Sequence, residues 1–221
     1  MSNNITYEEL DYYAHMASEA FMEDPMYKWT TPNEKKRKKY IYEMLRVRLY
    51  ASAKSDIIYE DEEKRGILIM RKALNSYDVA AMLKVPKRYK LNLYPGSLYR
   101  NFSFYSVFDN KDYFDENTYI LSPIFTAKEH WGKGVASGLI KKAIADLTAQ
   151  GYKIGLDTQN PDNIPFYEKL GFKLIGKKMY EINKENYLVK ENGEIDYDNY
   201  CNRWCWFYRF QLCVPYAGQI S

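Results

Sequence analysis

The segment that most restricts the fold lies near the middle of the chain. Tyr119–Thr126 and Lys153–Thr158 are short runs that predict strands, and the residues from about Gly134 to Gln150 have apolar positions at helical spacing. Gly132 and Gly134 mark the turn between the first strand and the helix. Because strand, glycine turn, helix and strand follow one another directly, the segment predicts one α/β domain with this unit at its centre.

Two helices are predicted near the N-terminus. Thr-x-x-Glu capping boxes at Thr6–Glu9 and Thr31–Glu34 each predict the start of a helix, the second with Pro32 at its first position. The second helix carries five consecutive cations, Lys35–Lys39, opposite a mostly apolar stripe. We interpret this run as a solvated helix face, and the alternative is a patch that binds nucleic acid.

The other predicted elements are mainly strands and turns. Asp56–Glu60 and Gly66–Met70, separated by a charged turn, predict an antiparallel hairpin. Asn160-Pro161 supplies a cap and a first-turn proline for a short helix that ends at Gly171. Further predictions are a short helix near Asp78–Leu83 within the irregular segment 76–116, strands at Phe172–Glu181 and Arg203–Phe210, and a turn at Asn192-Gly193.

Composition argues against some classes of partner. The net charge is only +3, so there is no overall electrostatic reason to expect nucleic acid. No apolar run approaches the roughly 20 residues of a membrane span, and the N-terminus lacks a signal-peptide core. The three cysteines are an odd number, which indicates reduced thiols. We therefore expect a cytoplasmic protein with neither a membrane nor a nucleic-acid partner.

The cysteines and histidines do not form a metal-binding pattern. Cys201 and Cys205 lie in or beside a predicted strand, and His15 and His130 stand singly. Zinc sites gather several such ligands at short spacings. We therefore expect structural thiols and no metal.

The glycine turn has the chemistry of an anion site. A helix N-terminus carries unpaired backbone N–H groups and the positive end of the helix dipole. Gly132 and Gly134 let an anion approach the backbone closely, and Lys133 adds a cation. The spacing does not fit a nucleotide P-loop, and Gly-x-Gly-x-x-Gly fails because position 137 is serine. On its own, a Gly-x-Gly turn is as often ordinary turn chemistry as a phosphate site.

A second motif, downstream of the glycine turn, decides how the turn is interpreted. Its residues are Asn160, Asn163, Tyr167, Gly171 and Phe172, which match the pattern Asn-x-x-[Ala/Asn]-x-x-x-Tyr-x-x-x-Gly-Phe. The turn itself, residues 131–136, matches the pattern Gln/Arg-x-x-Gly-x-Gly/Ala except that Trp131 stands where Gln or Arg is usual. With both motifs in this order, the chain resembles the GNAT superfamily of N-acetyltransferases over about residues 118–175.

The resemblance implies a fold and a cofactor site. The fold would be α/β (α+β), with a central mixed, mostly antiparallel sheet that splays at the acetyl-CoA site and has helices on both faces. One GNAT domain would span residues 1–221. Acetyl-CoA would be the co-substrate, and Tyr167 would be the general acid that protonates the departing thiolate. The implied cofactor-binding residues are Ile124, Phe125 and Thr126 through their backbones, Trp131, Gly132, Lys133, Gly134, Val135, Ala136 and Ser137 in the loop, and Asn160, Asn163 and Tyr167.

The implied reaction is direct attack of an amine on the thioester. Because an amine with a pKa near 10 must first lose a proton, the reaction needs a base or a water path. Candidate bases are Glu23, Asp24, Asp157 and His130, each of which is also an ordinary surface or cap residue. The acceptor would be a small molecule or a peptide. Asp24 and the acidic run Glu191–Asp198 lead to the hypothesis that it is cationic.

Two other functions stay open from the sequence. One is a non-catalytic acetyl-CoA or CoA-binding module or sensor, which Trp131 and the lack of an evident base would fit. The other is a nucleic-acid binder that uses Lys35–Lys39, which would not need the second motif. The sequence does not choose between a monomer and a homodimer.

Overall fold

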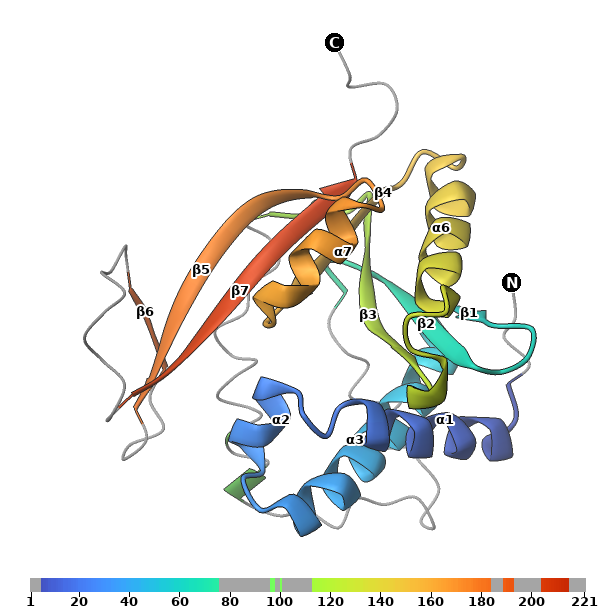
Figure 1. Ribbon diagram of the computed structural model, residues 1–221. Helices are drawn as coiled ribbons and strands as arrows, with labels where there is room; N and C mark the ends of the chain where they lie inside the picture. Colours follow the sequence, from blue (N-terminus) through green and yellow to red (C-terminus); the bar gives the residue numbers. More distant parts are fainter. Residues whose placement is uncertain are drawn as a thin grey trace.

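The computed structural model describes residues 5–75, 96–97, 100, 113–183, 189–192 and 204–214 (Figure 1). Within these ranges no helix has the length and apolar character needed to cross a membrane. Among the same residues, no group of three or more His, Cys, Asp or Glu side chains is placed to hold a metal ion.

The centre of the molecule is one mixed sheet with the strand order β1-β2-β3-β4-β7-β5-β6. β3 and β4 are parallel, and every other neighbouring pair is antiparallel. The prediction of a mixed, mostly antiparallel sheet is therefore confirmed. The strands are β1 (Ile57–Glu60), β2 (Gly66–Lys72), β3 (Thr118–Thr126), β4 (Lys153–Thr158), β5 (Lys173–Asn183), β6 (Val189–Asn192) and β7 (Trp204–Val214).

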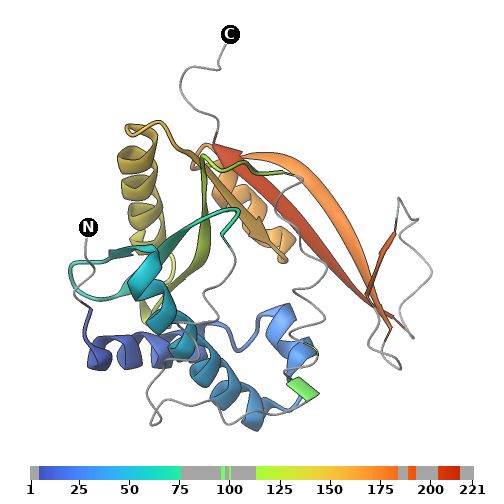
Figure 2. The same ribbon diagram turned by 180° about the vertical axis from the view of Figure 1, so that it is seen from behind.

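Helices cover both faces of the sheet, as expected (Figures 1 and 2). Side chains alternate along a strand, so neighbouring residues of β2 face opposite layers. Ile67 and Ile69 pack against α1 and α3, whereas Leu68 and Met70 pack against α6. The helical elements are α1 (Tyr7–Ala20), α2 (Pro25–Thr30), α3 (Glu34–Ser55), the 3₁₀ turn η2 (Lys128–His130), α6 (Val135–Thr148), the 3₁₀ turn η3 (Pro161–Asn163) and α7 (Ile164–Glu168).

The start of α3 differs from the prediction. The N-cap is Asn33, whose side chain accepts a hydrogen bond from the Lys36 N–H at 3.1 Å. Thr31 instead ends the short helix α2, and its buried hydroxyl donates to the Ser97 hydroxyl at 2.9 Å. Both residues are good caps in isolation, and the tertiary contact of Thr31 leaves Asn33 to cap the helix. Helix α2 was not predicted; Asp24 caps it.

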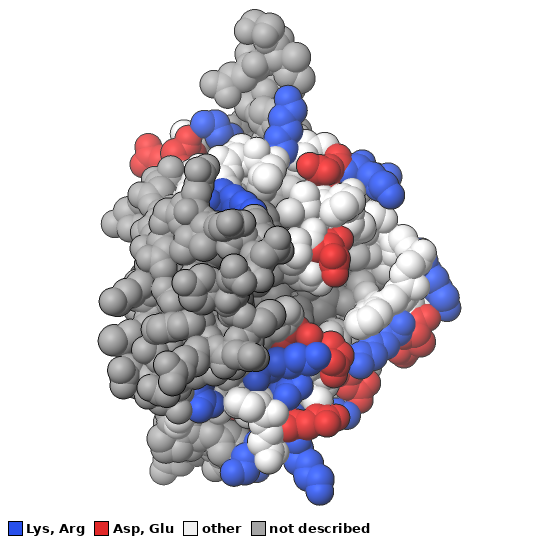
Figure 3. All heavy atoms as spheres, turned by 60° about the vertical axis from the view of Figure 1, so that its left-hand side comes forward, with Lys and Arg blue, Asp and Glu red and all other residues white. Residues whose placement is uncertain are grey.

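The basic run on α3 is a solvated face except at one position. The four lysines are exposed, and Lys38 and Lys39 lie near Glu19 and Glu43. Figure 3 shows cations interspersed with carboxylates over the described part of one face. Arg37 is buried, and its guanidinium donates to the carbonyls of Thr31, Met22 and Pro32 at 2.8–3.0 Å. Arg37 therefore ties together the chain between α1 and α3.

The C-terminal strands are longer and more numerous than predicted. β7 extends to Val214, and β6 is an additional strand that ends at Asn192, where a turn was predicted. The predicted helix after Asn160 is a 3₁₀ turn followed by α7. The predicted helix near Asp78–Leu83, Gly193, Cys201 and most of the acidic run Glu191–Asp198 lie outside the described residues.

Candidate functional site

The two parallel strands at the centre of the sheet pair over a short distance only. Their register pairs run from Thr118 with Lys153 to Ile120 with Gly155. Beyond that point β3 continues beside β2, and β4 continues beside β7. The strands therefore diverge toward their C-terminal ends (Figure 1), where loops and helix N-termini gather in parallel strand pairs.

A bulge in β3 lies at the start of this divergence. Leu68 pairs with Ile124 but Met70 pairs with Leu121, so β3 has one residue more than β2 between these pairs. The extra length falls at Ser122-Pro123. Proline has no N–H to give to a ladder, and a bulge is one of the few strand positions that accepts it. A bulge changes which backbone groups face each neighbouring strand.

Beyond the bulge, backbone groups of alternate residues face the open side of β3. The Ala127 N–H donates to the Arg65 carbonyl at 2.9 Å, so this residue faces the hairpin β1–β2. Because strand backbone groups alternate, Phe125 also faces β2, and Ile124 and Thr126 face the side where β4 has diverged. By this alternation the Phe125 backbone is directed toward β2, and its expected hydrogen bond to the cofactor stays a prediction. Its ring is buried against Phe21.

The glycine turn joins β3 to α6 through two left-handed residues. The φ angles of Gly132 and Gly134 are 73° and 85°, a region that residues with a Cβ rarely enter. Apart from Gly132 and its two chain neighbours, no heavy atom of the described residues lies within 4 Å of the position that a Cβ on Gly132 would take. Gly134 is the N-cap residue of α6 and offers no side-chain acceptor. The backbone at this helix N-terminus is therefore open to a ligand.

Several N–H groups of this turn have no acceptor within the described residues. Lys133 donates to the His130 carbonyl, and Gly138 donates to the Gly134 carbonyl as the first intrahelical bond. Between and around them, the unbonded donors are the backbone N–H groups of Gly132, Gly134, Val135, Ala136 and Ser137. Such donors, aligned with the positive end of a helix dipole, suit an anion.

Trp131 fills the loop position usually held by Gln or Arg. Its side chain is 54% exposed, and its indole N–H donates to the Thr126 carbonyl at 3.2 Å. The Lys128 ammonium lies 5.8 Å from the indole centroid. The indole therefore links the start of the glycine turn to the end of β3.

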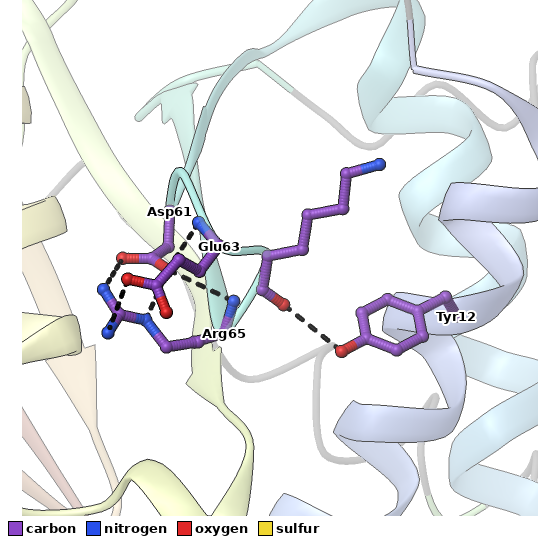
Figure 4. A network of polar contacts seen from close by, with 5 residues as sticks. Tyr12, Asp61, Glu63 and Arg65 are labelled. Carbon is purple, nitrogen blue, oxygen red and sulfur yellow. Dashed lines mark hydrogen bonds and ion pairs between the residues drawn. The ribbon is translucent and has the colours of Figure 1, made fainter.

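A polar network joins residues of the hairpin β1–β2 to one another and to Tyr12 (Figure 4). Arg65 binds Asp61 through two nitrogens at 2.7 and 3.0 Å and lies 3.2 Å from Glu63. Tyr12 of α1 donates to a hairpin carbonyl, that of Lys64, at 3.4 Å. Since the Arg65 carbonyl also holds Ala127, the first loop residue is tied through the hairpin to α1.

The asparagines of the second motif have short-range roles. The Asn160 side chain accepts from the Asp162 N–H at 3.0 Å and caps η3. The Asn163 amide lies 3.5 Å from the Thr158 hydroxyl, which places it beside the C-terminal end of β4. Asn163 is exposed and Tyr167 is buried.

Tyr167 is a buried phenol on α7. Its ring packs edge-on against Phe166 and Phe172, with centroids 5.2 and 5.8 Å away. Burial, and secondarily the charge of Asp157, raises the pKa of Tyr167 to about 12. The hydroxyl makes no hydrogen bond with the described residues. A protonated phenol without a partner is a donor that a ligand can use.

The residues named as candidate bases make hydrogen bonds or ion pairs with neighbouring residues, or lie in a turn. Asp24 accepts from the N–H groups of Met26 and Tyr27, and burial raises its pKa. Glu23 pairs with Lys28 at 2.5 Å, and this ammonium lowers the Glu23 pKa. Asp157 accepts from the Gln159 side chain at 3.2 Å. His130 lies in η2, directly before Trp131.

Residues 18–172 match the acetyltransferase (GNAT) family. The chain belongs to this family. Two solved structures with 17% sequence identity and a TM-score of 0.55 share the GNAT fold with this chain. One is described as histone acetyltransferase HPA2 and related acetyltransferase from Corynebacterium glutamicum, matched over 98% of this chain and 96% of that one. The other is an N-acetyltransferase from Staphylococcus aureus, matched over 97% and 100%.

Two features of this GNAT site were not anticipated from the sequence. The sequence does contain a signal for the bulge at Ser122-Pro123, because a proline inside a predicted strand indicates a bulge or an edge strand. The indole contact between Trp131 and Thr126 had none, because it depends on how the loop folds back in space.

Proposed function

We propose that the protein is an enzyme that transfers an acetyl group from acetyl-CoA to an amine, either a small molecule or a peptide. Membership of the GNAT family supports acetyl transfer in general. The observation that carries the proposal for this chain is the set of unbonded N–H groups from Gly132 to Ser137, beside the diverging strands β3 and β4. Such donors fit the pyrophosphate of CoA.

The backbone of β3 fits the pantetheine arm. The N–H and carbonyl groups of Ile124 and the N–H of Thr126 face the side from which β4 has diverged, whereas the Thr126 carbonyl accepts from the Trp131 indole. An extended arm that carries amides can bond to these groups as a neighbouring strand would. Lys133 would add a cation near the pyrophosphate, and Asn160 and Asn163 would lie near the arm at the end of β4.

Tyr167 is proposed as the general acid. The amine nitrogen attacks the thioester carbonyl, the carbon–sulfur bond breaks, and the departing sulfur takes the phenol proton. A thiol has a pKa near 8.5 and Tyr167 a pKa of about 12, so transfer of the proton to a free thiolate would be unfavourable by several pKa units. The transfer would therefore be coupled to the breaking of the carbon–sulfur bond, and the proton that the amine loses would return to the phenolate. The acceptor amine loses its own proton to a base or to water. Residues 1–221 would form one such domain.

The experiment has two parts. Calorimetry should detect binding of CoA and acetyl-CoA, and thiol release against a panel of amines should detect turnover. Tyr167→Phe should lower kcat on the order of 100-fold, because it removes the proton donor and keeps the ring packing. Tyr152→Phe, which removes the hydroxyl of a half-buried tyrosine, is the control and should leave kcat unchanged.

The same experiment separates the alternative function. A non-catalytic CoA-binding module or sensor would bind CoA and release no thiol with any amine. This alternative is favoured by Trp131, which stands where the family pattern has Gln or Arg. Absence of measurable CoA affinity would contradict both functions.

A further inference from the structure

The indole of Trp131 occupies an unusual place for a large apolar side chain. It is 54% exposed, so only part of its apolar surface is buried. Its directional contact is the 3.2 Å hydrogen bond from the indole N–H to the Thr126 carbonyl. Thr126 is the last residue of β3, and Trp131 directly precedes the glycine turn. The bond therefore closes the connection between the strand and the donors of the α6 N-terminus.

The turn has few other restraints on this side. Within the described residues, the 3₁₀ turn contributes the bonds His130 N–H to Ala127 and Trp131 N–H to Lys128, both of them local. Beyond these, Lys133 bonds to His130 at 3.3 Å, a long distance for such a bond. The two glycines add conformational freedom because they lack a Cβ. Helix α6 fixes the N–H groups of its first turn, whereas the directions of the Gly132 and Gly134 N–H groups depend on the conformation of the turn.

We propose that Trp131 is a positioning residue for CoA. Its indole N–H holds the Thr126 carbonyl and so keeps the N–H groups of Gly132 and Gly134 directed toward the pyrophosphate. The inference rests on the proposed function, because it assigns Trp131 a role in the binding of the same cofactor. It predicts that Trp131 acts on the pyrophosphate end of CoA and not on the pantetheine arm.

The test compares two ligands and three variants. Trp131→Phe keeps an aromatic ring and removes the donor, and it should weaken binding of CoA by about 5-fold, the loss expected for one hydrogen bond. Binding of acetylpantetheine, which has no pyrophosphate, should stay unchanged. Trp131→Gln supplies an amide donor and should restore CoA affinity to within about 2-fold. Tyr7→Leu changes another exposed aromatic residue, which lies on α1 and stacks on Tyr50, and it should have no effect.

Kinetics and exchange add independent readouts. Trp131→Phe should raise the KM for acetyl-CoA and leave kcat unchanged, because saturating cofactor orders the loop. In the free protein, the indole N–H resonance that disappears in this variant should exchange with solvent more slowly than that of an open indole.

Several outcomes would overturn the inference. Equal CoA affinity of the wild type and Trp131→Phe would mean that the bond does not position the loop. An equal loss for CoA and acetylpantetheine would place Trp131 on the arm instead. If the wild type does not bind CoA, the proposed function fails. Slow exchange of the indole N–H would then still show that Trp131 bonds to the Thr126 carbonyl, whereas fast exchange would show that this bond does not form.

Discussion

Ile120 of β3 and Gly155 of β4 are the last residues at which the two central parallel strands pair. Past this pair, the bulge at Ser122-Pro123 directs alternate backbone groups of β3 away from β2. The glycine turn and the N-terminus of α6 follow at the end of the same strand. The divergence, the bulge and the helix terminus thus belong to one stretch of chain, which explains why the sequence motif is continuous.

Gly134 should be intolerant of a side chain. Gly134→Ala forces alanine to a φ of 85°, which costs roughly 1–2 kcal/mol, and shifts the donors of the α6 N-terminus. We expect a lower midpoint of chemical unfolding and CoA affinity reduced by about 10-fold or more, measured by denaturation and calorimetry.

Gly138 offers a matched control on the same helix. A Cβ at this exposed position meets no atom within 4 Å, and its φ is not in the left-handed region. Gly138→Ala should therefore stabilise the protein by about 0.4–1 kcal/mol and leave CoA affinity unchanged. Equal effects of both alanines would contradict a special role for the Gly134 conformation.

The pH dependence of turnover should show no loss from Tyr167 in the neutral to moderately alkaline range. Its pKa is raised to about 12, so the phenol keeps its proton well above pH 10. With saturating substrates, kcat should rise as the amine loses its proton and should show no fall up to pH 10. Asp157→Asn removes a charge that raises the pKa of Tyr167, so any falling limb should move to lower pH. A wild-type falling limb near pH 9 that is absent in Tyr167→Phe would refute the shift.

The centre of the fold was predictable because its signals are local. Apolar periodicity placed β3, α6 and β4, and two glycines placed the turn between them. The errors occurred where distant contacts decide between local options. Thr31 and Asn33 are both competent caps, and only the contact of Thr31 with Ser97 separates them.

Contacts between residues that are distant in the sequence also limit what the motif can predict about the site. The spacing identified the loop residues, but the backbone directions of Ile124, Phe125 and Thr126 depend on the register with β2. The indole bond of Trp131 likewise depends on the folded loop. Side chains that act through a neighbouring strand or loop leave no periodic pattern in the sequence.

Arg37 should be the most important of the consecutive cations for stability. Arg37→Ala leaves three carbonyls, those of Met22, Thr31 and Pro32, without their charged donor. We expect the free energy of unfolding to fall by about 2–4 kcal/mol in urea denaturation. Lys35→Ala changes an exposed neighbour and should stay within about 0.5 kcal/mol. Comparable losses for both would mean that the guanidinium bonds contribute little.

Gly155 should be required because an aromatic ring takes the place of its side chain. A Cβ on Gly155 would lie 2.3 Å from the ring of Phe114, which is buried against this face of the sheet. Gly155→Ala should therefore destabilise the protein by about 1–3 kcal/mol, the usual cost of overpacking. In a Phe114→Ala background the added methyl meets no ring, so the same substitution should cost less than about 0.5 kcal/mol. Additive losses in this double-mutant cycle would show that the ring does not explain the glycine.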